Sequence, residues 1–356
     1  MRHTRSRRHR ILLASGAMLA VAGLLTACTP GETDPAAGGS GGASSDAGTP
    51  ASPEAAKPGE KVTIGFSGPA ADHGWMGAIN SAALKSAKGF SDVELVVAEG
   101  TNDASLQISQ IETFINNKVD AIVMLPTDGA ALTDVAIKAM QAGIPVVNVD
   151  REFSSNFAAR TTVLGDNYGM GVSAGTYICN ELGGKKDAVV AEIAGIDSLP
   201  LTQDRSRGFK EALGDCGLTV SNRVAADFTV QGGEAATSQL LASAPKLDAV
   251  WNHDDDQGIG VLAAITAANR NEFFMVGGAG SKNAMESIKA GDSVLRATVI
   301  YPSTQAADGI AMARLIALGL PATDFVTQGV PNRVVLDAPV VTKENVDTYI
   351  GAAFDS

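Results

Sequence analysis

The sequence predicts an α/β fold of two similar lobes, each built on a doubly wound, Rossmann-like parallel sheet. The chain has 356 residues, which is enough for two packed domains. Short apolar, β-branched segments alternate with segments of helical spacing, which is the pattern of βαβ units. Most of the strand-like segments are continuous apolar runs, as expected for strands buried on both faces of a sheet. Because this alternation occurs in two successive series, we expect two lobes.

The first series begins near Lys61. Its expected strands are Val62–Phe66, Val93–Val97, Ala121–Leu125 and Pro145–Val149, and its expected helices are Trp75–Lys88, Leu106–Asn116 and Leu132–Ala142. Asp103 can cap the second of these helices and Gly143 follows the third, so both positions have residue types that helix termini favour.

The second series has the same alternation. Its expected strands are Ala188–Ile193, Thr219–Ala225, Ala249–Asn252, Phe274–Val276 and Leu295–Ile300. Its expected helices are Tyr168–Leu182, Arg205–Leu213, Glu234–Ala242, Gly258–Ala268 and Lys282–Ala290. Gly291 follows the last helix, where a glycine commonly ends a helix.

Residues 1–27 have the parts of an export signal. An Arg-rich start, MRHTRSRRHR, precedes an apolar run from Ile11 to Leu25. The ending Leu25-Thr26-Ala27-Cys28 resembles the lipobox of bacterial lipoproteins, which implies cleavage before Cys28 and lipidation of that cysteine; the alternative is a signal followed by a chance cysteine. Ser6-Arg7-Arg8 resembles part of a twin-arginine signal, so the export route, Sec or twin-arginine, stays open.

Residues 28–60 predict a flexible tether. Beyond Cys28 the segment has no Val, Ile, Leu, Met, Phe, Tyr or Trp and is mostly Ala, Gly, Pro, Ser, Thr and acid, so it cannot bury enough apolar surface to offset its ordering entropy. A lipid anchor and a tether place the globular part outside the cytoplasm, at the outer face of the cell membrane. Disulfides persist there, so we expect Cys179 and Cys216 to be paired; the alternative is two small buried apolar residues.

The charge of the chain argues against a nucleic-acid-binding protein. The formal net charge is −12, and five Arg lie in the first ten residues. Residues 28–356 therefore hold 22 basic against 39 acidic residues, a net charge of −17. Contacts to a phosphate backbone need a basic surface, so we expect no nucleic-acid partner.

Candidate ligand residues lie in the loops after the expected strands, because ligands bind beyond the carboxyl ends of parallel strands. These loops are Ser67–Trp75, Pro126–Asp128, Asp150–Phe153, Gly195–Arg205, Asn252–Gln257 and Gly277–Ser281. Asp150 and Arg151 supply an acceptor pair and a rigid donor fork for adjacent hydroxyl groups. Trp75, Phe153 and Phe228 can supply aromatic faces for the C–H surface of a polyhydroxylated ligand.

The two histidines beyond the signal, His73 and His253, also fall in these loops. Each is either a ligand residue or a solvated turn residue. Trp251 lies inside an expected strand, so we expect it to pack in the core rather than to contact a ligand.

Enzyme motifs are missing from the sequence. No Gly-x-Gly-x-x-Gly follows the first strand, and there is no Walker-type loop, no Gly-x-Ser-x-Gly elbow and no His pair with zinc spacing. Two clusters leave alternatives open: Gly277–Gly280 could cradle a phosphate, and Asp254–Asp256 could hold a cation or favour a helix N-terminus near Gln257. We expect a binding protein without catalytic residues, metal or cofactor.

Three segments resemble the ribose-binding protein family, the type I periplasmic sugar-binding proteins of ABC importers. They are Ala121-Ile-Val-Met-Leu-Pro-Thr-Asp128, Ala142-Gly-Ile-Pro-Val-Val-Asn-Val-Asp-Arg151 and Gly165-Asp-Asn167, and the similarity extends over nearly all of residues 61–340. The resemblance implies a bilobed receptor with three crossovers between lobes, which closes over one small sugar. It implies an N-terminal lobe of residues 61–164 and 302–334, and a C-terminal lobe of residues 165–301 and 335–356.

The resemblance also implies a set of ligand residues. Asp150 and Arg151 match the family directly, Trp75 and Phe228 match stacking aromatics, and Asp254 falls where an Asn or Asp binds hydroxyls. The full set is Asp72, His73, Trp75, Met76, Asp150, Arg151, Gln203, Arg205, Phe228, Asp254 and Tyr301.

Several positions depart from the family pattern. Gln203 replaces a ligand Arg, with Arg205 at a neighbouring and less direct position, and Tyr301 replaces a hydroxyl-binding Gln. Gly278-Ala279-Gly280 replaces an aromatic residue, an Asp and a Gly. These changes make ribose itself doubtful, so a larger sugar or a linear polyol is as plausible as a pentose ring.

The sequence therefore predicts a monomeric, lipid-anchored solute receptor that passes a monosaccharide or sugar alcohol to ABC permease and ATPase subunits. The main alternative is a sugar receptor for chemotaxis or signalling that uses the same site. A repressor of the LacI type would need a basic helix-turn-helix before the core, where residues 1–60 have a signal and a tether instead.

Overall fold

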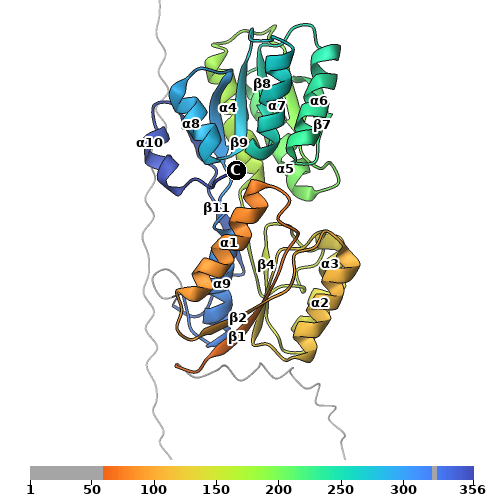
Figure 1. Ribbon diagram of the computed structural model, residues 1–356, viewed down its shortest axis with the longest axis vertical. Coiled ribbons are helices and arrows are strands. Elements are labelled where there is room, and N and C mark those ends of the chain that lie inside the picture. The colour runs from red at the N-terminus through yellow and green to blue at the C-terminus, as the bar shows by residue number, and fades with distance from the viewer. Residues whose placement is uncertain (1–58, 323–326) are drawn as a thin grey trace, which may run out of the picture. The chain divides into compact units, whose positions relative to one another are not determined.

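The computed structural model describes residues 59–322 and 327–356. They form two six-stranded sheets with helices on both faces (Figure 1), which confirms the predicted fold class. The expected signal, Cys28 and almost all of the tether lie outside the described residues. Within these residues no helix is long and apolar enough to cross a membrane.

The first sheet is entirely parallel, in the order β11-β5-β4-β3-β1-β2. Its strands are β1 (Val62–Ser67), β2 (Val93–Val97), β3 (Ala121–Met124), β4 (Val146–Val149), β5 (Thr161–Gly165) and β11 (Arg333–Leu336). Helices α1 (Gly74–Lys88) and α9 (Gln305–Ala317) pack on one face, and α2 (Ala104–Asn116) and α3 (Gly129–Gln141) pack on the other (Figure 1). β1, β3 and β4 are buried on both faces, which explains their uninterrupted apolar sequences.

The second sheet has the order β12-β10-β9-β8-β6-β7, with only β12 antiparallel. Its strands are β6 (Val190–Ala194), β7 (Val220–Ala225), β8 (Ala249–Asn252), β9 (Phe274–Ala279), β10 (Leu295–Ile300) and β12 (Val340–Thr342). Its helices are α4 (Asn167–Glu181), α5 (Pro200–Asp215), α6 (Val230–Ser243), α7 (Asp255–Ala267), α8 (Lys282–Ala290) and α10 (Val346–Tyr349), followed by a short 3₁₀ helix at Ile350–Ala352.

The chain passes between the two sheets three times. It leaves the first sheet after β5, returns after β10 to form α9 and β11, and crosses again to β12. β5, α9, β11 and β12 were not among the elements expected from periodicity. β11 is a four-residue edge strand whose exposed and half-buried positions alternate, and its apolar run, Val334–Leu336, is shorter than the runs that mark a buried strand.

Helices α4 and α5 pack closely because small residues line their contact. A side-chain carbon at Gly171 would lie 2.0 Å from the carbonyl oxygen of Arg205, so the backbones approach to a distance that only glycine permits. This approach brings Arg205 next to the N-terminus of α4.

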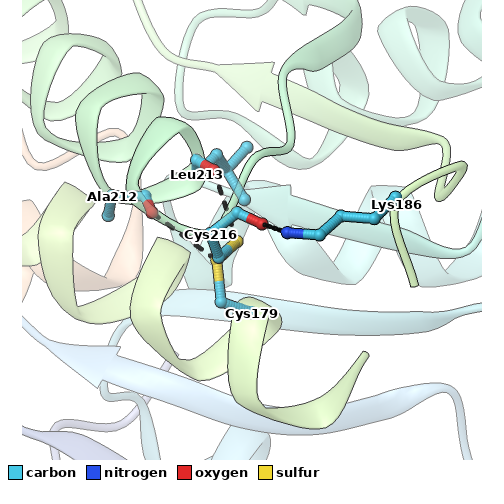
Figure 2. The surroundings of a disulfide bond; sticks show 5 residues. All are labelled: Cys179, Lys186, Ala212, Leu213 and Cys216. Carbon is cyan, nitrogen blue, oxygen red and sulfur yellow. Dashed lines mark hydrogen bonds between the residues drawn. A yellow bond between two sulfur atoms is a disulfide. The ribbon is translucent and has the colours of Figure 1, made fainter. Parts of the chain in front are cut away.

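A disulfide between Cys179 and Cys216 ties the end of α5 to α4 (Figure 2). The two Cα atoms lie 6.1 Å apart and the residues are 37 positions apart in sequence. Lys186 Nζ donates a hydrogen bond of 2.7 Å to the carbonyl oxygen of Cys216 beside it. The disulfide therefore holds α4 and α5 together on the second sheet.

Candidate functional site: a cleft between the two sheets

A small cavity lies where the carboxyl ends of the two sheets face each other. The first sheet and α1 contribute His73, Trp75, Met76, Asp150 and Arg151; the second sheet and its helices contribute Leu201, Arg205, Phe228, Asp254 and Tyr301. Nine of these ten residues belong to the set expected from sequence, and Leu201 does not. The cavity has a volume of about 30 Å³, which is room for about one water molecule.

A second cavity continues the first along the cleft. It shares Asp150, Arg151 and Leu201 with the first cavity and has a volume of about 130 Å³. Its other lining residues include four acids or amides, Asp128, Glu152, Asn167 and Asp204. The two cavities together form a cleft whose walls come from both sheets and carry both apolar and charged side chains.

Asp150 and Tyr301 join the two walls directly. The Tyr301 hydroxyl donates to Asp150 Oδ1 at 2.5 Å, and Asn167 Nδ2 donates to the same hydroxyl at 3.1 Å. Asp150 has a left-handed backbone with φ of 63°, a conformation that Asp tolerates better than most residues. Burial raises the pKa of Tyr301, and the nearby Asp150 charge raises it further, so the phenol stays a neutral donor.

Arg205 is the buried cation of the cleft. Its Nε donates to Asn167 Oδ1 at 2.9 Å and its Nη1 donates to the carbonyl oxygen of His253 at 3.1 Å. Its guanidinium lies 4.4 Å from the centroid of the Tyr301 ring and 6.0 Å from that of Phe228, within the range of cation–π attraction. Asn167 thus links Arg205 to Tyr301.

Asn167 is a site residue that the sequence argument missed. It stands in the Gly165-Asp-Asn167 segment that resembles the ribose-binding family, and its side chain is 5% exposed. Its place in this segment, as the first residue of the helix that follows β5, was the sequence signal that could have identified it.

His253 lies beneath the cleft rather than in it. It is fully buried, its Nε2 is 3.0 Å from Glu192 Oε1, and its ring centroid is 4.1 Å from that of Trp251. Complete burial lowers the pKa of His253, so the ring is neutral and Nε2–H donates to Glu192. Neither a ligand role nor a solvated turn fits this position, whereas the core packing expected for Trp251 is confirmed.

Three residues expected at the site lie outside the cavity. Gln203 is exposed and donates to the carbonyl oxygen of Asp197, because α5 begins at Pro200 and turns Gln203 away from the cleft. Asp72 is exposed and accepts from Asn102 Nδ2 at 2.9 Å, while its other oxygen is 2.6 Å from His73 Nδ1. Phe153 packs half-buried against the apolar cluster under α2 and α3.

The two clusters left open by the sequence have structural roles, and the helix N-terminus expected near Gln257 is confirmed. The backbone amides of Gly278 and Gly280 donate to Asp255 at 2.9 Å each, so a carboxylate of the chain fills the place of a phosphate. Asp254 Oδ1 caps α7 by accepting from two of its amides. Asp256 accepts from the backbone of Trp75 instead, and no group of three or more metal-type ligands occurs among residues 59–322 and 327–356.

Burial raises the pKa of Asp254 well above its ordinary value, and the neighbouring Asp256 charge adds to the shift. The second wall therefore presents the Asp254 carboxyl group beside the Arg205 cation. A neutral ligand with hydroxyl groups can bond to both kinds of group, because a hydroxyl both donates and accepts.

Comparisons with known proteins agree with a ligand-binding cleft. The profile described as "Periplasmic binding protein domain" matches residues 64–321. The ribose import binding protein RbsB of Bacillus subtilis (strain 168) is 32% identical over 258 residues, which are 70% of this chain and 82% of that protein. The xylitol-binding protein of Mycolicibacterium smegmatis is 26% identical over 266 residues, covering 73% of this chain and 72% of its own.

Among solved structures, an ABC transporter solute binding protein from Mycobacterium smegmatis with bound glycerol superposes with a TM-score of 0.74 at 26% identity. The superposition covers 83% of this chain and 99% of that chain. The similarity therefore extends over both sheets and the cleft between them.

Proposed function

The chain belongs to the periplasmic binding protein family, and from that premise we propose that it captures a monosaccharide or sugar alcohol outside the cytoplasm and delivers it to the permease of an ABC importer. The family consists of solute-binding proteins, so the role is binding without catalysis. Relatives bear names that specify ribose import and xylitol binding, which favours import over a signalling role.

One observation supports this proposal above the others: the cleft combines hydroxyl-binding groups from one wall with aromatic and cationic groups from the other. Asp150 and Arg151 offer acceptors and donors beside Trp75, and Arg205 stands opposite with Phe228. Adjacent sugar hydroxyls suit paired acceptors and donors, and C–H surfaces suit aromatic faces. A ligand that touches both walls favours the closed arrangement, because only that arrangement provides both sets of contacts.

A ligand can contact Trp75 and Phe228 only if the walls separate first. The cavity that these two aromatic residues line has a volume of about 30 Å³, which holds one water, and a monosaccharide is several times larger. The adjoining cavity of about 130 Å³ is lined by neither aromatic residue. We assign the ligand contacts to the nine expected residues that line the cavity, with Asp72 acting through His73. Gln203 is left out of this set.

We propose the lobe boundaries expected from sequence, residues 61–164 with 302–334 and residues 165–301 with 335–356. The sheet memberships of β11 and β12 support two lobes that are each discontinuous in sequence, although β11 extends in the first sheet to Leu336, two residues past the proposed boundary. We also propose an export signal, a lipid on Cys28 and a flexible tether, which hold a monomeric protein at the outer face of the cell membrane. The N-terminal sequence and the family's extracytoplasmic role support this proposal.

A thermal-shift panel of the chain against pentoses, hexoses and linear polyols tests the proposed function. A ligand at a hundred times its dissociation constant adds about 2.7 kcal/mol of stability. We expect at least one member of the panel to raise the melting temperature, and Asp150→Ala to abolish that shift while leaving the ligand-free protein folded. Silence across all three classes would contradict the proposal.

A further inference from the structure

Helix α1 starts without a cap of its own. The first amides of a helix have no partner within the helix and need one from elsewhere. Asp103, Asp128, Asp166, Thr229, Asp254 and Ser281 each supply a side-chain oxygen to the helix that follows them. His73 stands in the same position before α1 and makes no such bond.

The missing cap comes from across the cleft. Asp256 Oδ2 accepts from the backbone N–H of Trp75 at 2.8 Å, although Asp256 lies 181 residues away in α7. Asp256 is 3% exposed. Its own helix does not require it, because Asp254 already caps α7.

Gly74 makes room for this contact. A side-chain carbon at Gly74 would lie 2.6 Å from Asp256 Oδ1 and 2.7 Å from the Cα atom of Ser356. Any other residue at the first position of α1 would hold the carboxylate away. Gly74 thus leaves the space in which the Asp256 carboxylate contacts the N-terminus of α1.

The residue that Asp256 holds is also a wall of the cavity. Trp75 lines the cavity, its indole Nε1 donates to the carbonyl oxygen of Tyr301 at 3.1 Å, and its ring centroid lies 5.4 Å from that of Tyr301. These bonds join α1 to segments of the second sheet. Each is made by the chain itself and breaks when the walls separate.

We propose that Asp256 is a positioning residue of the cleft, which caps α1 from the opposite wall and so fixes Trp75 and stabilises the closed arrangement before any sugar binds. Opening the cleft removes the cap from α1, and closing restores it. The inference goes beyond the proposed function, because it concerns the protein without ligand and does not depend on which sugar binds.

Solvent exchange of the Trp75 indole N–H tests the proposal in the full chain without ligand. The chain has two tryptophans, so two indole signals are expected in the NMR spectrum. The Trp75 indole N–H bonds across the cleft and exchanges when the cleft opens. The Trp251 indole belongs to a fully buried residue of the second sheet, so its exchange reports unfolding of that sheet instead.

Three substitutions separate a closure role from a merely structural one. Asp256→Ala should speed exchange of the Trp75 indole N–H roughly 2- to 30-fold, the range of equilibrium shifts that loss of an N-cap produces, and leave Trp251 unchanged. Gly74→Ala should do the same with Asp256 intact, because the added methyl blocks docking. Asp103→Ala, which removes the cap of α2 within the first sheet, should leave Trp75 exchange at the wild-type rate.

Two results would overturn the proposal: an unprotected Trp75 indole in the wild type, or equal Trp75 exchange in the wild type and in Asp256→Ala. If Asp256→Ala also speeds Trp251 exchange, the variant has lost its fold and Gly74→Ala decides. Asn is as good a cap as Asp, so Asp256→Asn should restore most of the protection. A silent sugar panel would contradict the proposed function and leave these exchange results standing.

Discussion

Replacing Arg205 by Met should destabilise the protein, because this guanidinium satisfies two buried acceptors at once. Arg205 is 4% exposed, and its bonds to Asn167 Oδ1 and to the carbonyl oxygen of His253 measure 2.9 and 3.1 Å. Hydrogen bonds from a charged donor contribute about 1.5–3 kcal/mol each. Removing a buried charge and gaining apolar contacts offsets part of that loss.

We therefore expect Arg205→Met to lower the free energy of unfolding by about 2–4 kcal/mol, measured by urea denaturation. Arg207→Met is the matched control, since Arg207 lies two positions further along α5 and its guanidinium is largely exposed, in an ion pair of 2.6 Å with Asp204 and 4.7 Å from the centroid of the Tyr168 ring. Such surface pairs contribute about 0–1 kcal/mol. Equal losses in the two variants, or a loss below about 1 kcal/mol for Arg205→Met, would refute this account of the buried cation.

Other predictions concern the disulfide, the buried histidine and the ligand contacts. The Cys179–Cys216 bond spans 37 positions, so replacing both residues by Ser should cost about 4 kcal/mol in the chain-entropy account; alkylation of both thiols without reductant, seen by intact mass, would show that no bond forms. Because burial lowers the pKa of His253 from 6.5, protonation favours the unfolded chain, and the free energy of unfolding should fall as the pH drops below about 6.5. His253→Gln should flatten that slope, and an unchanged slope would assign it to other groups. With the sugar that the panel identifies, Arg151→Ala should cost roughly 2–5 kcal/mol of binding free energy and Trp75→Ala roughly 1–3 kcal/mol by calorimetry; near-wild-type affinity would remove that residue from the ligand set.

The alternation of apolar runs and helical spacing was sufficient to predict the interior of both sheets. Every expected strand overlaps a strand of the structure. Burial on both faces gives the central strands β1, β3 and β4 continuous apolar sequences, whereas the edge strands β2 and β7 are partly exposed. β11 pairs with β5 although Arg333 and Thr162 lie far apart in the chain. No local pattern encodes such a pairing, so periodicity alone could not have supplied it.

Nine of the eleven expected ligand residues line the cavity, and Gln203 does not because its direction depends on where α5 begins. Asp150 and Tyr301 follow β4 and β10 directly and line the cavity as expected. Gln203 was expected in a loop that ended at Arg205, whereas α5 begins five residues earlier at Pro200. That shift decides which side chains of the helix face the cleft. The bond from Trp75 to Asp256 had no local signal, because a carboxylate near one helix does not reveal that it caps another.

The three passages of the chain between the sheets also decide the order in which the protein can be assembled during synthesis. The first sheet begins with β1, yet its edge strand β11 and its covering helix α9 come after the whole of β6–β10. Until α9 has been made, the valines of β3 and β4 that lie against its Gly309 have no cover, and until Leu336 has been made β5 has a free edge. Domains tend to fold as units from the N-terminus, but here the sheet begun first is finished last. The N-terminal half of the chain therefore cannot complete its own sheet, because α9 and β11 come from the last sixty residues.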